Sequence, residues 1–182
     1  MSDSLVQILD HDPAWLIRFA EEAARVSTVM ARWLVEPVEH IGSTSVPQLA
    51  AKPVVDMLAV VETLKDAPAI VGALEGEGWL FWPDDPGRDY RLWFLRPRPE
   101  ARTHHLQVLQ RGDVRAVALL AFRDALRADE LVRSAYAQLK RQLAEQHPSN
   151  RNAYTNAKSV FVAGVLRDVG LEGVLARDRL PE

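Results

Sequence analysis

Residues 53–61 read Pro-Val-Val-Asp-Met-Leu-Ala-Val-Val, and this apolar run constrains the fold more than any other segment of the chain. Apolar side chains fill both alternating sets of positions, which is typical of a strand buried on both faces. The one charged residue, Asp56, shares a strand face with Val54, Leu58 and Val60. A carboxylate in such surroundings is costly unless it is paired, hydrogen-bonded or bound to a metal. The run therefore predicts a central strand and marks Asp56 as a candidate functional residue.

A short turn rich in hydroxyl groups, Gly42-Ser43-Thr44-Ser45, precedes this strand. Gly42 allows a tight turn and a close approach of the backbone to a ligand. The three hydroxyl residues Ser43, Thr44 and Ser45, with their N–H groups, can surround an anion. Lys52 is a second candidate for phosphate binding, and Asp56 can hold a divalent metal that faces the anion. This arrangement suits a nucleoside triphosphate with Mg²⁺. The alternative is a structural Asp56 that accepts hydrogen bonds from the turn.

Hydrophobic periodicity and turn signals predict the other elements. Asp12 and Asp113 are expected to cap helices, and Pro83-Asp-Asp-Pro-Gly is expected to form a turn. Strands in the middle of the chain with helices at both ends predict one α+β domain over residues 1–182. The predicted strands are 36–41, 53–61, 78–82, 89–96 and 101–110. The first three predicted helices are 13–34, 66–76 and 113–126. A fourth helix is marked by Leu131, Ala135, Leu139 and Leu143, and a fifth runs from the break at 147–150 to about Val169.

Composition excludes several classes of protein. The absence of cysteine excludes disulfides, thiolate metal sites and thiol nucleophiles. The N-terminal sequence lacks the features of a signal peptide, and the chain has no apolar run of about 20 residues, so we expect a cytoplasmic protein without a membrane span. A net charge of −3 argues against binding of a nucleic-acid polymer. Residues 88–115 nevertheless hold seven arginines against three carboxylates, which suits a small anionic ligand or an ordinary solvated surface.

Several segments carry a family resemblance. Gly42-Ser43 followed by Asp56 on the next strand resembles the active-site signature of the nucleotidyltransferase superfamily. More narrowly, five segments are similar to the GrpB-like family. They are His-Ile-Gly-Ser-Thr-Ser-Val-Pro at 40–47, Ala-Ala-Lys-Pro-Val-Val-Asp at 50–56, Arg-Thr-His-His-Leu at 102–106, Phe-Arg-Asp-Ala-Leu-Arg at 122–127 and Ala-Tyr-Thr-Asn-Ala-Lys-Ser-Val-Phe at 153–161. The resemblance implies a nucleotidyltransferase-like mixed sheet with flanking helices and a C-terminal helical bundle.

The resemblance also assigns roles to residues. It implies Mg²⁺ or Mn²⁺ held by Asp56, with His105 as a second metal ligand or a general base. It implies that Tyr154 and Lys158 contact the phosphate or the base of the nucleotide. His105 is expected on the strand face opposite to that of its neighbour His104.

Further residues complete the predicted site. His40 is expected to orient the turn, and Gln107 stands where GrpB-like sequences tend to have a second histidine. Gln48 stands where they commonly have glycine. Arg91 is a candidate for phosphate binding because it lies in the basic zone at 88–115.

One residue divides the functional hypotheses. Active nucleotidyltransferases usually carry a second carboxylate two residues after the first, and here that position is Leu58. The leading hypothesis is a nucleotidyltransferase that uses a nucleoside triphosphate and an acceptor that the sequence does not identify. The second is a non-catalytic module that binds a nucleotide or another small anion, and the third is an interaction or stability module.

Overall fold

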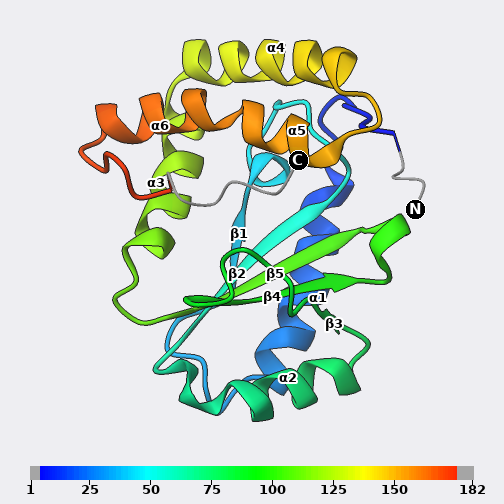
Figure 1. Cartoon of the computed structure of the whole chain (residues 1–182), viewed down its shortest axis with the longest axis vertical. Helices are drawn as coiled ribbons and strands as arrows, with labels where there is room; N and C mark the ends of the chain where they lie inside the picture. The colour runs from blue at the N-terminus through cyan, green and yellow to red at the C-terminus, as the bar shows by residue number, and fades with distance from the viewer. Residues whose placement is uncertain (1–4, 176–182) are drawn as a thin grey trace.

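A single five-stranded sheet organises the protein, whose computed structural model describes residues 5–175 (Figure 1). The strand order is β1-β2-β5-β4-β3, with β2 and β5 parallel and all other neighbours antiparallel. The mixed sheet confirms the predicted α+β class. The ends of the predicted 1–182 domain, residues 1–4 and 176–182, lie outside the described residues. The strands are β1 (Glu39–Ile41), β2 (Val55–Val61), β3 (Leu80–Phe81), β4 (Arg91–Arg96) and β5 (His104–Gln110).

Helices cover both faces of this sheet, in two groups. The helices α1 (Ala14–Val29) and α2 (Ala67–Gly76) pack on one face. The helix α3 (Val114–Ala128) packs on the other, and the remaining helices gather beside it at one end of the molecule (Figure 1). These are α4 (Glu130–Gln146), α5 (Arg151–Ala157) and α6 (Ser159–Asp168), which together with α3 form the expected C-terminal helical bundle.

The central strand β2 is buried on both faces, as its apolar run predicts. Met57 and Ala59 point into the core made with α1 and α2. Leu58 and Val60 point to the opposite face, where they pack with Leu109 of β5 and with α3. Asp56 lies on the same face as Leu58, near the beginning of the strand, and 31% of its side-chain surface is exposed to solvent. The fold therefore places the one carboxylate of the strand at the edge of the second core.

The first helix is shorter than the predicted 13–34. The side chain of Asp12 accepts the N–H of Ala14, as a capping residue does, but the helix ends at Val29. The backbone then turns so that Leu34 and Val35 pair with the last residues of β2. The strand β1 likewise begins at Glu39 instead of residue 36. Pairing with the sheet has overridden the helical periodicity, which extends through Trp33.

The last predicted helix is divided in two. The helix α5 ends at Ala157 and α6 begins at Ser159, with Lys158 between them. Thr155 and Asn156 have low helix propensity, which explains why the helical hydrogen bonding is interrupted at this point. The interruption places Lys158 at the junction of α5 and α6.

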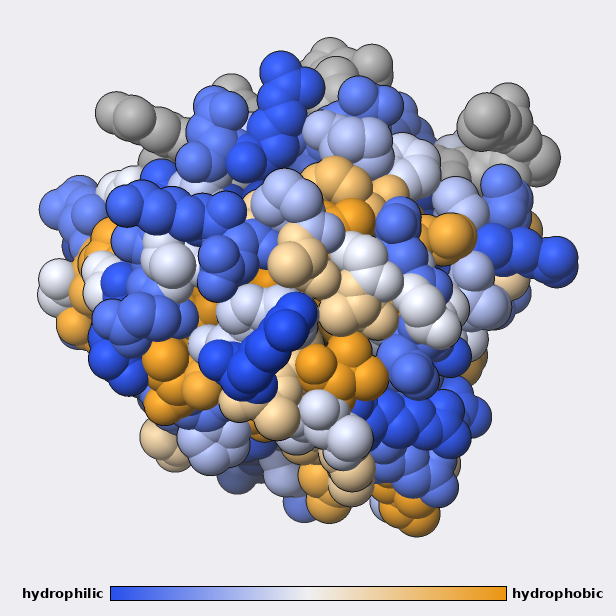
Figure 2. All heavy atoms as spheres, turned by 90° about the horizontal axis from the view of Figure 1, so that it is seen from below, coloured by the Kyte–Doolittle hydropathy of each residue, from blue (hydrophilic) through white to orange (hydrophobic). Residues whose placement is uncertain are grey.

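The outer surface is mixed in character. Seen from the end that carries α2, small hydrophobic patches alternate with charged side chains (Figure 2). Within the described part of the chain, no helix is long and apolar enough to cross a membrane.

Candidate functional site between the sheet and the C-terminal helices

Gly42 holds the turn before β2 against the carboxylate of Asp56. Its backbone has φ +68° and ψ −172°, a combination that is essentially limited to glycine. A Cβ atom at this position would lie 2.6 Å from Oδ2 of Asp56. The close approach that the sequence predicts at Gly42 is therefore an approach to Asp56. Six residues after Gly42, Gln48 also has a left-handed backbone, with φ 64°, which is uncommon for a residue other than glycine.

The hydroxyl groups of the turn have different environments. Thr44 donates to the carbonyl of Val54 (3.2 Å), so His40 must donate from Nε2 to the Thr44 oxygen (3.0 Å). Burial lowers the pKa of His40 to about 4, so the ring is neutral and serves to hold the turn. Ser45 donates to the carbonyl of Gly42 at 2.6 Å. Both hydroxyls thus have partners within the turn and its strand.

Ser43 points away from the turn, toward the helical bundle. Its hydroxyl is hydrogen-bonded to the phenol of Tyr136 on α4. Burial raises the pKa of this phenol, so Tyr136 stays protonated. Of the three hydroxyls predicted to surround an anion, Ser43 is the one that reaches the space between the sheet and the C-terminal helices.

Asp56 and His105 form a pair across the two parallel strands. Nδ1 of His105 lies 2.9 Å from Oδ1 of Asp56. Burial raises the pKa of Asp56, but the hydrogen bond and charge of His105, with the charges of Lys52 and Lys158, outweigh burial and lower the pKa overall. The ionised carboxylate accepts the N–H of Nδ1, which fixes the orientation of the His105 ring. Nε2 is buried and has no hydrogen-bond partner among residues 5–175.

Three lysines converge beside this pair. Lys52 and Lys158 both lie over the ring of Tyr154, with their ammonium nitrogens 4.9 and 4.4 Å from the ring centre. Lys140 is 2% exposed; its ammonium donates to the carbonyl of Ala50 and lies 4.8 Å from the ring centre of Tyr136.

The lysine charges are poorly balanced. Among residues 5–175, neither Lys140 nor Lys158 has an ion pair, and Asp56 is the one carboxylate whose charge acts on Lys158. Burial, followed by Arg141 and Lys52, lowers the pKa of Lys140 to about 7. Burial, followed by Lys52 and Lys140, lowers the pKa of Lys158 well below its usual value. The protein thus holds lysines whose charged forms are disfavoured in the absence of a further anion.

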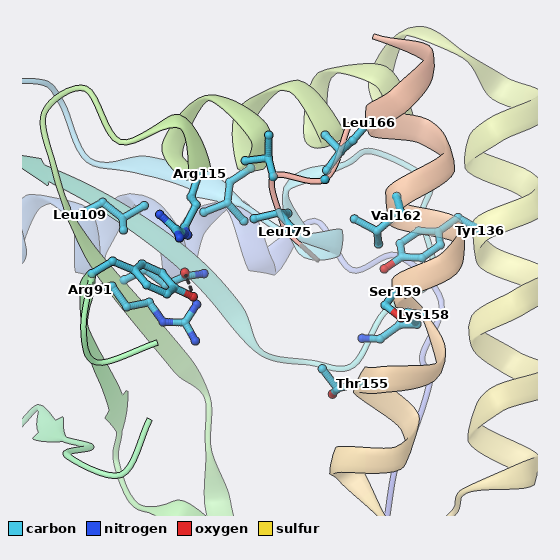
Figure 3. A pocket seen from close by; sticks show the side chains of 16 residues that line it. Arg91, Leu109, Arg115, Tyr136, Thr155, Lys158, Ser159, Val162, Leu166 and Leu175 are labelled. Carbon is cyan, nitrogen blue, oxygen red and sulfur yellow. Dashed lines mark hydrogen bonds between the residues drawn. The ribbon is translucent and has the colours of Figure 1, made fainter. Parts of the chain in front are cut away.

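A cavity of about 220 Å³ lies between the sheet and α5–α6 (Figure 3). Lys158 and Ser159 project from one wall, and Arg91 and Arg115 project from the opposite wall. Asp56 and His105 do not line this cavity; they lie beside it, with Gln107 two residues beyond His105 on the same face of β5. Its apolar wall comes from β5, α3, α6 and the segment that follows α6, at Leu109, Leu119, Val162, Ala163, Leu166, Val174 and Leu175.

Arg91 lines the cavity with its charge already balanced. Its guanidinium donates to both carboxylate oxygens of Asp85, from Nε at 2.7 Å and from Nη2 at 2.8 Å. Nη1 donates to Oε1 of Gln107 at 3.1 Å, the bond drawn in Figure 3. Two other arginines of the basic zone at 88–115 also have carboxylate partners. Arg96 pairs with Glu22 on the far face of the sheet, and Arg115 pairs with Asp113. Among the described residues, Lys140 and Lys158 therefore have no paired carboxylate, whereas these arginines do.

Sequence analysis missed Lys140, Tyr136 and Arg115. Tyr136, Lys140 and Leu143 form the buried face of α4 at spacings of four and three residues. A lysine three or four residues from apolar residues lies on the same side of a helix as they do, so the spacing was a sequence signal available for Lys140. Arg115 is stacked on Tyr90, with its guanidinium carbon 3.7 Å from the ring centre. That contact joins the start of α3 to the loop before β4, and no sequence pattern indicates it.

The residues do not fit a resident divalent metal. Among the described residues, no three His, Cys, Asp or Glu side chains lie together as a metal site requires. Asp56 is engaged by His105 through Oδ1, and the position that a second carboxylate would occupy is filled by Leu58, which is fully buried against Ile41 and Val60. The nearby lysines add positive charge, which opposes a bound cation.

Comparison with known proteins identifies relatives over nearly the whole chain. The model of the family described as "GrpB protein" matches residues 5–168. A UPF0157 protein of Pseudomonas aeruginosa is 38% identical over 167 residues, which span 90% of this chain and 67% of the relative. A UPF0157 protein of Halalkalibacterium halodurans is 35% identical over 89% of this chain and 81% of its own. The crystal structure of conserved protein GrpB from Enterococcus faecalis is 32% identical and superimposes with a TM-score of 0.81, covering 89% of this chain and 96% of that one.

Proposed function

The chain belongs to the GrpB protein family, and we propose that it binds a small phosphate-bearing ligand, of the nucleoside triphosphate class, beside Lys158. The observation that carries this proposal is that Lys52 and Lys158 lie close to one carboxylate, Asp56, and that the buried Lys140 lies close enough to act on Lys158. Buried charges are normally paired, because an unpaired one loses its hydration without compensation. A phosphate group supplies the missing negative charge. It would restore the charged form of lysines whose pKa is lowered in the free protein.

The polar groups around the cavity suit a phosphate in kind and in position. Lys158 and the hydroxyls of Thr155 and Ser159 form the wall on the helical side, and Arg115 lies on the wall opposite. Lysine ammonium groups and hydroxyls are ordinary donors to phosphate oxygens. The hydrogen bond between Ser43 and Tyr136 links this wall to the turn at 42–45. A ligand that contacts α5–α6 would thereby be connected, through Tyr136 and Ser43, to the turn beside Asp56.

The size of the cavity limits how the ligand sits. A volume of about 220 Å³ is below the roughly 300–1,000 Å³ of pockets that enclose a drug-sized molecule. We therefore propose that the cavity encloses the phosphates and that the nucleoside reaches out along the apolar wall. Since no resident metal site fits the residues, Mg²⁺ or Mn²⁺ would arrive on the triphosphate, with Asp56 as the protein's carboxylate nearest to it. We retain the expectation of a cytoplasmic protein that binds no nucleic-acid polymer.

Thermal unfolding with a graded set of ligands tests the proposal. ATP with Mg²⁺ is expected to raise the melting temperature, because a ligand selective for the folded state adds about 2.7 kcal/mol at one hundred times its Kd. Inorganic tripolyphosphate tests the phosphates alone, and adenosine tests the nucleoside alone. Tripolyphosphate is expected to retain most of the stabilisation and adenosine little of it. No shift with any nucleoside triphosphate at millimolar concentration contradicts the proposal and favours an interaction or stability module.

The Asp56–His105 pair favours nucleotidyl transfer as a second candidate function. In that reaction, Nε2 of His105 takes the proton of an acceptor hydroxyl, whose oxygen forms a bond to the α-phosphorus as pyrophosphate leaves. Asp56 holds the ring through Nδ1 in the tautomer that this step needs. Leu58 argues for a slow reaction, because a single carboxylate cannot support a two-metal site.

Incubation with ATP labelled at the α-phosphate separates transfer from binding alone. We expect slow or undetectable transfer of the labelled nucleotidyl group to an acceptor by the wild type. We expect Leu58→Asp to raise the affinity for Mn²⁺ if melting curves show that the variant folds. If the wild type transfers the nucleotidyl group rapidly and His105→Asn transfers it at the same rate, His105 is not the general base.

A further inference from the structure

Residues 122–127 of α3 lie against the turn that precedes β2, and they contact it with two rows of side chains. Phe122 and Leu126, one helical turn apart, form the apolar row. They pack in a hydrophobic cluster with Val46 and Leu49, which come just after the turn. The apolar row therefore brings the neighbouring face of α3 within reach of the backbone of the turn.

Two arginines on that neighbouring face donate to backbone carbonyls on either side of the glycine of the turn. Arg127 donates to the carbonyl of Ser45 from both Nε and Nη2, at 3.2 and 2.8 Å. Arg123 donates from Nη1 to the carbonyl of His40 at 3.1 Å and to the carboxylate of Glu39 at 2.6 Å. Ser45 is the last residue of the turn, and His40 lies just before it. The two arginines thus hold the chain where it enters the turn and where it leaves it.

The charges of both arginines are balanced by carboxylates. Asp124 accepts from Nε and Nη2 of Arg123, at 2.7 and 3.2 Å, and its Oδ1 lies 3.6 Å from Nη1 of Arg127. Glu39 is the second carboxylate, paired with Arg123. This balance distinguishes the two arginines from the buried lysines of the site, and it indicates a role in holding the backbone of the protein instead of binding an anion.

The turn is itself connected to the cavity beside Lys158. Ser43 is hydrogen-bonded to the phenol of Tyr136, which lines the cavity (Figure 3). The backbone of Gly42 lies against the carboxylate of Asp56. A shift of the turn would therefore move Ser43 and the backbone beside Asp56 together. A site whose parts are held in place before the ligand arrives loses less conformational freedom on binding.

We propose that Arg123 and Arg127 are positioning residues, which hold the turn at 42–45 in the geometry that the ligand requires. Neither side chain lines the cavity, so they act through the turn and not by contact with the ligand. Their effect on affinity rests on the proposed function. Their effect on the conformation of the turn does not, and the two effects can be measured separately.

Hydrogen exchange of the amides of the turn, followed by NMR, tests the effect on conformation. The N–H groups of Ser45 and Val46 donate to carbonyls within the turn, so they exchange faster when the turn opens. Arg127→Met and Arg123→Met should each speed exchange at both amides at least tenfold, while the amides of α2 keep their rates. Arg127→Lys keeps the charge but has one donor nitrogen, so its exchange rates should fall between those of the wild type and Arg127→Met.

Calorimetric titration of ATP with Mg²⁺ tests the effect on affinity. Arg127→Met should weaken binding at least fivefold, and Arg127→Lys should recover part of the loss. Arg111→Met is the control, because it removes an equal charge from an exposed ion pair with Glu62, at the other end of β2 from the turn. It should leave both exchange and affinity unchanged. Melting curves establish that each variant is folded.

The outcomes separate this inference from the proposed function. Wild-type exchange at Ser45 and Val46 in folded Arg127→Met overturns the inference. Weaker binding without faster exchange also overturns it, because the charge would then act on the ligand directly. Faster exchange with unchanged affinity overturns the positioning role, because the turn would then be held for stability alone. If the wild type does not bind ATP, the proposed function fails, whereas selectively faster exchange in Arg127→Met still shows that the arginine holds the turn.

Discussion

Two neighbouring histidines of β5 lie on opposite faces of the sheet, in charged clusters that differ in one respect. His104 faces α1, where Glu22 accepts from both Arg96 and Arg25 and is itself 4% exposed. His105 faces the C-terminal helices and pairs with Asp56, which among residues 5–175 is the one carboxylate that acts on Lys158. In the first cluster the buried Glu22 pairs with the largely buried Arg96, and Arg25 is largely exposed to solvent; in the second, the buried Lys140 and Lys158 have no ion pair among residues 5–175.

The difference separates structural charge from functional charge. A balanced buried cluster needs no further partner, and removing one member leaves an uncompensated charge. An unbalanced cluster is costly in the free protein and is relieved by a ligand of opposite charge. We therefore expect mutations on the two faces to have opposite consequences. The α1 face should govern stability, and the face of the C-terminal helices should govern binding.

The largest effect is expected on the α1 face. Glu22→Ala leaves Arg96 in a largely buried setting without its carboxylate, and it should lower the free energy of unfolding by about 3 kcal/mol. Urea denaturation measures the change. Glu21→Ala, at the exposed neighbouring position, is the control and should have little effect. Phosphate-ligand binding should persist in folded Glu22→Ala, and a selective loss of binding would break the division between the faces.

The next effect concerns the turn. Gly42→Ala introduces a side chain where the backbone conformation alone costs about 1–3 kcal/mol, and the new Cβ would meet the carboxylate of Asp56. Urea denaturation should show a loss of at least this size, and the Asp56–His105 pair should be displaced. Gly72→Ala is the control, since Gly72 lies in α2 with open space around it and should be unchanged or slightly more stable. Equal losses in the two variants would remove the special role of Gly42.

A smaller effect, spread over pH, is expected from Lys140. Its pKa is lowered from 10.5 to about 7, so between these values the unfolded state binds more protons than the folded state. The free energy of unfolding should therefore rise with pH over this range, by up to about 1.4 kcal/mol per pH unit from this group. Below about pH 7 both states are protonated, and the destabilisation by Lys140 is complete and constant.

Lys140→Met should make the pH dependence shallower between about pH 7 and 10, as measured by urea denaturation at several pH values. Lys65→Met removes an exposed lysine and should keep the slope of the wild type. Identical slopes in Lys140→Met and the wild type would mean that folding does not lower the pKa of Lys140.

Sequence patterns predicted the elements better than their ends. The buried strand β2, the caps at Asp12 and Asp113 and the C-terminal bundle follow from local periodicity and side-chain chemistry. The end of α1 does not, because it depends on the pairing of Leu34 and Val35 with a strand more than 20 residues away. The break at Lys158 was missed because one interrupted turn leaves the apolar spacing of the two helices nearly continuous.

The site was partly predictable for the same reason. Asp56 and Lys158 stand out because each places a charge within an apolar pattern. The pairing of Arg91 with Asp85 was not predictable, because it depends on the conformation of the turn between β3 and β4. Local patterns thus identify unusual residues, and the fold decides which of them have partners.

The most direct test of the central claim is the affinity for ATP with Mg²⁺ of the wild type and Lys158→Met, measured by calorimetric titration. Removing a lysine whose charge is poorly balanced should leave stability unchanged or raise it by about 1 kcal/mol. The same change should weaken ATP at least tenfold, while the control Lys65→Met binds as the wild type does. Wild-type affinity in a folded Lys158→Met variant would contradict the proposal that the unbalanced lysines of this face bind the ligand's phosphates.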